Sequence, residues 1–234
     1  MISNEFWFLI LLPVVAMLYA SVGHGGASGY LALMGLFSFV PDKMKPTALL
    51  LNLFVSGISF FHFWKAGYHN AKLFLSFAIG SIPFAFLGGM TDVNPKWYKI
   101  TLGIFLLFAV VRMLFQVKTK KKSELKYGLA ILIGAVIGFF SGMIGIGGGI
   151  ILSPIILLLG WGSVKESAAV SALFIWVNSL SGLIGNYLMN GNQYDEQSFI
   201  FIVLAILGGL VGGYLGSKQF NLKILKYVLM VVLL

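Results

Sequence analysis

Long uninterrupted apolar runs recur along this chain and constrain its fold more than any other feature. Only short polar segments separate them, and several approach the roughly 20 residues that a helix needs to cross a bilayer. Hydrophobic residues make up 59% of the chain and charged residues 10%, with a mean hydropathy of +0.97, whereas soluble domains carry about 25% charged residues. A water-soluble fold could not bury this much apolar surface. The sequence therefore predicts a polytopic membrane protein.

The apolar runs are typical of helices rather than strands. They fall near residues 6–20, 29–40, 46–64, 72–90 and 97–117, and after a basic segment near 127–144, 149–160, 166–189, 198–217 and 223–234. Backbone groups in a bilayer must be hydrogen-bonded internally, and the runs lack the alternation of apolar and polar residues that marks an outer-membrane barrel. We therefore predict an all-α membrane protein.

The two groups of five runs resemble each other. Residues 22–27 (VGHGGA) and 144–149 (IGIGGG) share glycines at three matching positions, at an offset of 122 residues. Gene duplication is the simplest explanation. We predict a first transmembrane repeat over residues 1–117, a basic linker over 118–126 and a second repeat over 127–234. Each repeat would contain a glycine-tipped hairpin or broken helix and about three spanning helices.

The placement of lysines predicts how the two repeats are oriented. If each repeat crosses the membrane an odd number of times, eleven lysines share the side of the linker, and Lys43, Lys45, Lys96 and Lys99 lie opposite. If the runs that flank each glycine cluster form one broken span, the same count becomes seven to eight. Cytoplasmic loops are enriched in Lys and Arg, which favours the odd number. The repeats would then be inverted relative to each other, with the linker in the cytoplasm.

The net charge of +9 reports this topology rather than a nucleic-acid partner, because the basic residues lie in loops between apolar runs. Cysteine is absent, which excludes disulfides, thiolate metal sites and a cysteine nucleophile. We expect no metal site and no cofactor. The first residues lack the basic n-region of a cleavable signal peptide, so we expect the first run to belong to the mature protein.

Two glycine clusters interrupt apolar segments at matching positions and predict a substrate site. Each such glycine costs about 1 kcal/mol of helix stability relative to alanine, so the clusters need a reason. Successive glycines let backbone N–H groups converge on an anion, and helix N-termini near the membrane midplane add the positive ends of their dipoles. The predicted binding residues are Gly23, His24, Gly25, Gly26, Ala27 and Ser28 in the first cluster and Gly145, Ile146, Gly147, Gly148 and Gly149 in the second.

Close helix packing is the alternative explanation for a glycine in an apolar run. Small residues at a spacing of four let membrane helices touch. We interpret Gly208, Gly212 and Gly216, and likewise Gly209 and Gly213, in this way. Packing stays open for the two clusters as well, although consecutive glycines exceed what packing requires.

Three polar side chains within or near the clusters complete the predicted site. His24 is the only ionisable side chain within a cluster, and an imidazole could bind an oxyanion and couple transport to protons, or simply bond a carbonyl. Asn52 and Asn178 lie at roughly equivalent positions in the runs that follow the clusters. They could donate to the substrate, and interhelical hydrogen bonding explains them equally well.

Residues 139–154 (FFSGMIGIGGGIILSP) resemble the TauE/SafE family of membrane permeases, sometimes called sulfite exporters. The residues that match its glycine-rich segment and following proline are Gly142, Gly145, Gly147, Gly148, Gly149 and Pro154. Residues 167–174 (SAAVSALF) are similar to the alanine- and serine-rich start of the family's next helix. The first repeat departs from the pattern, with His24 in place of Ile146 and no counterpart of Pro154. The resemblance implies export of sulfite, sulfoacetate or a related sulfonate across the bacterial cytoplasmic membrane, and no enzymatic activity.

We therefore predict a secondary transporter that moves this anion by alternating access at a midplane site between the two glycine loops. Its partners would be the small anion and the lipid bilayer of the inner membrane, and a small bundle with apolar faces is compatible with a homodimer. A passive anion channel would share the same site. A third alternative is an intramembrane serine protease, because Gly26-Ala27-Ser28-Gly29 matches the GxSG motif of rhomboid proteases, with His62 on a later run as partner of Ser28.

Overall fold

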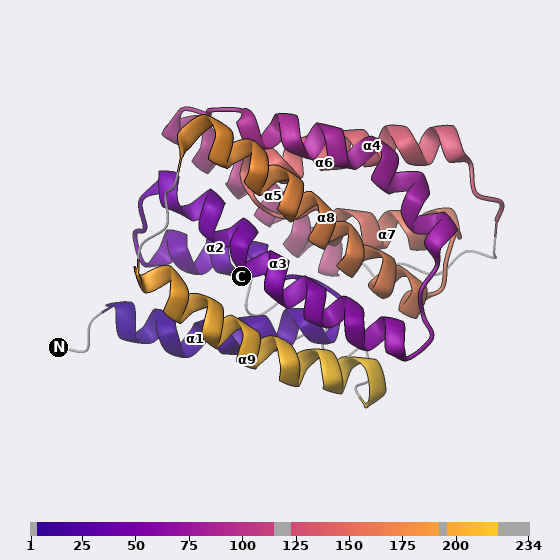
Figure 1. The fold of residues 1–234 in the computed structure, drawn as a ribbon, viewed down its shortest axis with the longest axis horizontal. Helices are drawn as coiled ribbons and strands as arrows, with labels where there is room; N and C mark the ends of the chain where they lie inside the picture. Colours follow the sequence, from indigo (N-terminus) through magenta and orange to yellow (C-terminus); the bar gives the residue numbers. More distant parts are fainter. Residues whose placement is uncertain (1–3, 115–122, 192–195, 220–234) are drawn as a thin grey trace.

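A computed structural model describes residues 4–114, 123–191 and 196–219 of the chain. Within these ranges all regular secondary structure is helical, which confirms the predicted all-α class (Figure 1). The helices are α1 (Asn4–Ser21), α2 (Ala27–Leu36), α3 (Pro41–Lys65), α4 (Ala71–Met90), α5 (Pro95–Leu114), α6 (Tyr127–Ile144), α7 (Gly149–Leu159), α8 (Val164–Asn190) and α9 (Glu196–Lys218). Residues 118–122 of the predicted linker and the predicted run 223–234 lie outside the described residues.

Local sequence signals set several of the helix boundaries. Pro41 stands at the start of α3, where its missing N–H leaves no hydrogen bond unmade. The predicted run 29–40 is helical only to Leu36, where α2 ends before a turn with Ser38 at φ 60°. The Asn70 side chain caps α4 by accepting from the N–H of Leu73. Ser163 and Glu166 form a capping box at the start of α8. Polar residues between the apolar runs thus act as helix caps.

Five of the helices, α3, α4, α6, α8 and α9, are long and apolar enough to cross a membrane. The ten residues of α2 and the eleven of α7 span about 15 Å, roughly half of the hydrocarbon thickness. Many large apolar side chains are exposed on the outside of the bundle, among them Ile79 and Phe199. A surface of this kind is stable only against lipid, so the chain is a multi-pass membrane protein.

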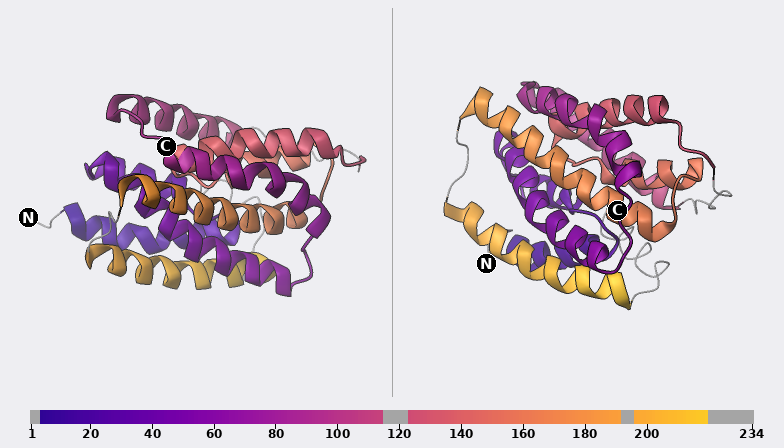
Figure 2. Two further views of the ribbon diagram at one scale, coloured as in Figure 1. Left: turned by 45° about the horizontal axis from the view of Figure 1, so that its top comes forward. Right: turned by 45° about the vertical axis from the view of Figure 1, so that its right-hand side comes forward.

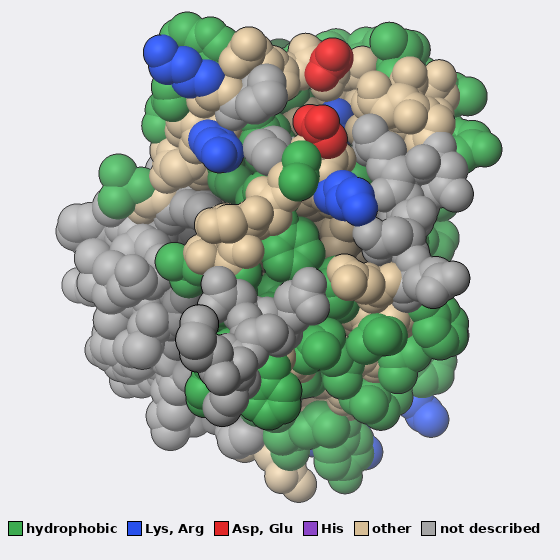
Figure 3. Space-filling view, turned by 90° about the vertical axis from the view of Figure 1, so that its left-hand side faces the viewer, with side chains coloured by type: hydrophobic (Ala, Val, Ile, Leu, Met, Phe, Trp, Pro, Cys, Tyr) green, Lys and Arg blue, Asp and Glu red, His purple; other side chains and the backbone are tan. Residues whose placement is uncertain are grey.

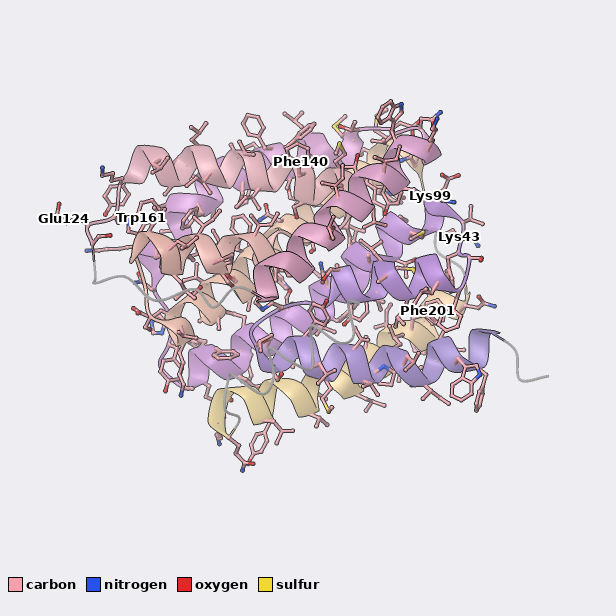
Figure 4. All side chains as sticks on the ribbon, turned by 180° about the vertical axis from the view of Figure 1, so that it is seen from behind. Lys43, Lys99, Glu124, Phe140, Trp161 and Phe201 are labelled. Atoms are coloured by element: carbon pink, nitrogen blue, oxygen red, sulfur yellow. The ribbon has the colours of Figure 1, made fainter. Side chains whose placement is uncertain are left out.

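The two glycine clusters lie at the tips of hairpins, not between two full crossings. In Figure 1, α1 starts at the left end, the chain reverses over residues 22–26, and α2 leads back to that end. The pair α6 and α7 starts from the right end and reverses over residues 145–148. Figure 4 shows the same arrangement from behind, with Lys43 and Lys99 at one end and Glu124 and Trp161 at the other. Both hairpins therefore place their tips inside the molecule.

Glycines let the helices of the bundle approach closely. The helix α9 packs on α1 and α3, as both views of Figure 2 show for α1, while α4 packs on α6 and α8. A Cβ atom on Gly208, Gly212 or Gly216 would lie within 2.1 Å of a backbone oxygen of α1. Gly209 and Gly213 face α3. These contacts confirm the packing interpretation of the five glycines.

Substitution of one of these glycines should loosen the bundle. In Gly212→Ala, the new methyl carbon would lie 2.0 Å from the carbonyl oxygen of Met17, and only a helix shift can relieve that contact. We expect a loss of about 1–3 kcal/mol of stability, measured as a lower melting temperature in detergent. Gly128→Ala is the control, because its Cβ would meet no atom within 4 Å. Equal melting temperatures for the two variants would contradict the packing role.

The described lysines separate onto the two ends of the bundle. Lys43 and Lys45 lie in the first turns of α3, and Lys96 and Lys99 in those of α5; both helices begin at the left end of Figure 1. Lys72 and Lys165 lie in the first turns of α4 and α8, Lys126 directly precedes α6, and Lys65 and Lys218 are the last residues of α3 and α9. These helix ends all lie at the right end of Figure 1. This separation matches the one expected for an odd number of crossings in each repeat.

Candidate functional site

The two glycine loops are built alike and meet in the interior. Gly26 precedes α2 with φ 96° and Gly148 precedes α7 with φ 75°, a left-handed conformation that residues with a Cβ rarely adopt. Each of these glycines turns the chain directly into a helix, so the N-termini of α2 and α7 both lie at a loop tip. Residues 23–30 and 144–149 are all buried. The predicted loop residues therefore lie inside the protein.

Asn52 joins the two loops. Its side chain is fully buried in the middle of α3, where Oδ1 accepts from the N–H of Ala27 at 3.0 Å and Nδ2 donates to the carbonyl of Ile146 at 3.4 Å. One bond thus reaches the start of α2 and the other the second loop. The carboxamide supplies the donor and the acceptor that this position needs. Asn52 thus connects the two loops through its hydrogen bonds.

The contact with Asn52 leaves no space for side chains at the loop tips. A Cβ on Gly25 would lie 2.3 Å from Oδ1 of Asn52, and one on Gly147 would lie 2.5 Å from its Nδ2. Ile175 of α8 closes the other side, because its Cγ2 would be 3.0 and 2.8 Å from the same two Cβ atoms. Gly149 also faces Ile175. The glycines of both loops are therefore required by close approach, in addition to the backbone conformation.

His24 reaches from the first loop toward the second hairpin. Its Nδ1 lies 3.0 Å from the carbonyl oxygen of Val22, and its Nε2 lies 3.4 Å from the hydroxyl of Ser153 on α7. That hydroxyl donates to Ser171 on α8 at 2.7 Å, and Ser167 donates to the carbonyl of Ser153 at 3.1 Å. A polar chain therefore runs from the first loop to α8.

The contact between the hydroxyls of Ser153 and Ser171 can run in either direction. If Ser171 donates, the Ser153 hydroxyl can donate to Nε2 of a neutral His24, whose Nδ1–H donates to the carbonyl of Val22. If Ser153 donates to Ser171, an imidazolium can donate from Nε2 to Ser153. Both charge states of His24 are therefore compatible with the link between the two hairpins.

Asn178 does not mirror Asn52. Its Nδ2 donates to the carbonyl of Phe174 in its own helix at 2.9 Å. Its Oδ1 is buried and accepts no hydrogen bond from the residues that the structure describes. The expected symmetry of the two asparagines therefore fails in their contacts, although both are fully buried. Buried amide oxygens usually accept a hydrogen bond, so this position needs an explanation.

Ser28 and His62, the pair expected for a serine protease, have different neighbours. The Ser28 hydroxyl donates to the hydroxyl of Tyr19 on α1 at 2.8 Å. His62 lies near the C-terminal end of α3 and packs against Gly213 and Tyr214 of α9. In the described part of the chain, no three His, Asp or Glu side chains are grouped to hold a metal ion.

Ser153 and Ser171 are functional candidates that the sequence did not single out. Ser153 directly precedes Pro154, and Ser171 lies in the serine- and alanine-rich segment, so both stand within motifs that carry the family resemblance. Serine is common in membrane helices, where it bonds its own backbone. What distinguishes these two serines is the contact of Ser153 with His24 and the hydrogen bond between Ser153 and Ser171.

A polar cavity of about 560 Å³ leads inward from the end where α3 begins. Figure 3 looks onto this end, where Asp and Lys side chains gather over the upper half of the face. Lys45, Thr91 and Tyr98 line the cavity, with Asn186 and Asn190 of α8. The Tyr98 hydroxyl donates to the carbonyl of Ile144 at 2.9 Å. Tyr98 thus connects the wall of the cavity to the last residue of α6, which leads into the second glycine loop.

Comparison with known proteins places the chain among membrane transporters. The profile of the family described as "Sulfite exporter TauE/SafE" matches residues 8–234. The probable membrane transporter protein y4hK of Sinorhizobium fredii is 36% identical over 94% of this chain and 92% of its own length. The probable membrane transporter protein MJ0441 of Methanocaldococcus jannaschii is 31% identical over 95% and 90%. Sulfite exporter TauE/SafE family protein 1 of Arabidopsis thaliana is 28% identical over 39% of this chain and 19% of its own. No solved structure matches.

Proposed function

This chain belongs to the TauE/SafE sulfite exporter family of membrane transporters, and we propose that it is a secondary transporter that exports a small sulfur-containing anion. Sulfite, sulfoacetate and related sulfonates are the proposed substrate class, from the description of the family. Members of this family are permeases rather than enzymes, so the protease alternative is set aside.

The meeting of the two glycine loops at Asn52 carries this proposal. Two helix N-termini, of α2 and α7, point their N–H groups and positive dipole ends into one buried region. The polar groups nearby are the imidazole of His24 and the hydroxyls of Ser153 and Ser171. All of these can donate to the oxygens of a sulfite or sulfonate group, and none carries a negative charge. The region therefore suits a small anion.

We further propose that residues 1–117 and 127–234 are inverted repeats joined by the linker 118–126. The packing of the helices supports this, because α4 contacts α6 and α8 while its counterpart α9 contacts α1 and α3. The hairpins enter from opposite ends, as expected for repeats related by an axis in the membrane plane. The end of the bundle where α3 and α9 end, at the right of Figure 1, would face the cytoplasm of a bacterial inner membrane, and the linker would lie on that side. A homodimer stays compatible with this arrangement.

The different contacts of Asn52 and Asn178 support alternating access as the mechanism. Asn52 holds the two loops in the present conformation, while Asn178 leaves an amide oxygen without a donor. In a second conformation related by the repeat symmetry, Asn178 would make the corresponding bonds to the loops and Asn52 would release them. The two states would then differ by an exchange of equivalent hydrogen bonds, which keeps their free energies close.

Flux of labelled sulfite into proteoliposomes tests the proposed function. We expect saturable uptake that exceeds the uptake by protein-free liposomes and that is competed by sulfoacetate. Flux that rises linearly with sulfite concentration, without trans-stimulation by internal anion, would instead favour the passive channel. Folded wild-type protein that moves neither sulfite nor a sulfonate would overturn the substrate assignment.

His24 is expected to couple transport to protons. In His24→Ala, the link from the first loop to Ser153 is lost, so an imposed pH gradient should no longer drive accumulation. We expect gradient-driven accumulation to fall about tenfold while downhill exchange of sulfite continues. The measurement compares uptake with and without the gradient. Ser21→Ala is the control, because the Ser21 hydroxyl donates to the carbonyl of Leu18 in its own helix. An unchanged response to pH in His24→Ala would leave His24 as a structural residue.

A further inference from the structure

The polar cavity beside the second glycine loop contains a buried lysine that the proposed site does not use. Lys45 is 7% exposed, and its Nζ donates to the carbonyls of Gly89 at 2.7 Å and Thr91 at 3.2 Å. These carbonyls belong to the C-terminal end of α4, where a cation is favourable. Since an ammonium has three donors, one remains for the cavity.

Capping of α4 alone does not account for a lysine at this position. Lys45 lies near the N-terminus of α3, where the helix dipole disfavours a positive charge, and a buried charge carries a further cost. A neutral donor could cap the same carbonyls. What a lysine adds is a positive charge in the wall of the cavity near the second glycine loop, and the carboxylate of Asp92 interacts with that charge. The backbone of Lys45 indeed touches that loop, because a Cβ on Gly145 would lie 3.1 Å from the Lys45 carbonyl oxygen.

We propose that Lys45 is the anion-recognition residue of a vestibule, in which a small oxyanion binds before or after it occupies the site between the loops. Asn186 and Asn190 line the same cavity and bond each other, with Nδ2 of Asn190 donating to Oδ1 of Asn186 at 3.2 Å. The carboxylates of Asp42 and Asp92 also face it, but both side chains are exposed, so water and salt screen them more than they screen the buried ammonium. The role of the vestibule in transport rests on the proposed function, whereas its affinity for anions does not.

Thiol chemistry tests the vestibule without any transport measurement. The chain has no cysteine, so Thr91→Cys introduces a single thiol into the cavity next to Lys45. The substitution keeps the hydrogen bond between Lys45 and residue 91, because Lys45 donates to the backbone carbonyl of that residue. The thiol is modified with an anionic and with a cationic methanethiosulfonate, and the ratio of the two modification rates is measured. Both reagents react with the same thiolate, so its fraction cancels in the ratio, which then reports the local electrostatic potential. We expect Lys45→Met to lower this ratio about tenfold. Lys45→Arg should keep it, and added methanesulfonate should protect the thiol only when residue 45 is cationic.

Lys43→Met is the matched control, because it removes the same charge from an exposed position on the same helix that does not line the cavity. We expect it to change the ratio less than about twofold. An equal change in Lys43→Met and Lys45→Met, or no change in Lys45→Met, would overturn the vestibule. A general fall in melting temperature for both Lys45 variants, with an unchanged ratio, would identify Lys45 as a helix cap only.

Transport kinetics then separate this inference from the proposed function. In Lys45→Met we expect the KM for sulfite to rise about tenfold, with the maximal rate nearly unchanged, as for the loss of a charged hydrogen bond in binding. Lys45→Arg should restore the KM. If the wild-type protein transports sulfite and both variants keep its KM, the vestibule role fails and the function stands. If the wild type transports no sulfur anion, the proposed function is wrong. The ratio of thiol modification rates then decides by itself whether the vestibule binds anions.

Discussion

Gly25→Ala is expected to lower the rate of sulfite transport about 100-fold while the bundle stays folded. The new methyl carbon would lie 2.3 Å from Oδ1 of Asn52, and since the backbone of Gly25 has no left-handed φ, this contact is the main obstacle. Asn52 must rotate away, which breaks its bond to the N–H of Ala27. A shift of about 1 Å in a binding group can cost about 100-fold in rate, so we expect a loss of that size.

Gly35→Ala provides the matched control for this variant. It lies in the same hairpin ten positions along, and a Cβ there would meet no atom within 4 Å. Alanine in a helix is more stable than glycine by about 0.5–1 kcal/mol, so this variant should melt slightly higher and transport at the wild-type rate. Combination of Gly25→Ala with Asn52→Ala should show coupling in stability, because the smaller side chain removes the clash. Full transport activity in Gly25→Ala would show that the loop tips do not need to touch Asn52.

Asn52→Leu is expected to destabilise the protein and to stop transport. Leucine has a similar volume but leaves the N–H of Ala27 and the carbonyl of Ile146 buried without their partner. Each unsatisfied group costs about 1–3 kcal/mol, and both hairpins lose their common anchor. The measurement is the free energy of unfolding in detergent, together with sulfite flux in proteoliposomes.

Asn178→Leu should behave differently in these two measurements. In the present conformation its Nδ2 bonds only the carbonyl of Phe174, and its Oδ1 has no partner in the described part of the chain. We therefore expect a stability change below about 1 kcal/mol. Transport should still fall, because Asn178 is needed in the proposed second conformation. A loss of stability equal to that of Asn52→Leu, or undiminished transport, would argue against the exchange of the two asparagines.

The helices could be predicted closely from the sequence, because their causes are local. The runs near 127–144 and 149–160 correspond to α6 and α7, and the break between them coincides with the glycine cluster. Pro41 begins α3, and α2 ends before it at Leu36. Whether the runs at each glycine cluster cross the membrane stayed open, because both α2 and α7 are apolar throughout. Their direction depends on the turn at residues 22–26 and 145–148, and only the structure shows that they are hairpins.

That the predicted residues bind substrate stays a prediction. The two glycine loops lie close together and both bond Asn52, and His24 lies in the first loop. Ser28 instead bonds Tyr19 of its own hairpin. Ser153, Ser171 and Lys45 were not predicted as site residues, since neither serine nor a lysine near a helix end is unusual in a membrane protein.

The sequence by itself determined the membrane location, the helical class, the two glycine breaks and the family of this protein. These follow from composition and from short motifs, because the bilayer acts on each apolar segment separately. Only the tertiary structure decided which polar groups meet. Asn52 bonds a residue 94 positions away, and His24 contacts one 129 positions away. The packing of whole helices determines which residues so far apart in the sequence meet. For this reason Asn52 and Asn178, which lie at roughly equivalent positions in the two repeats, have different contacts in this conformation.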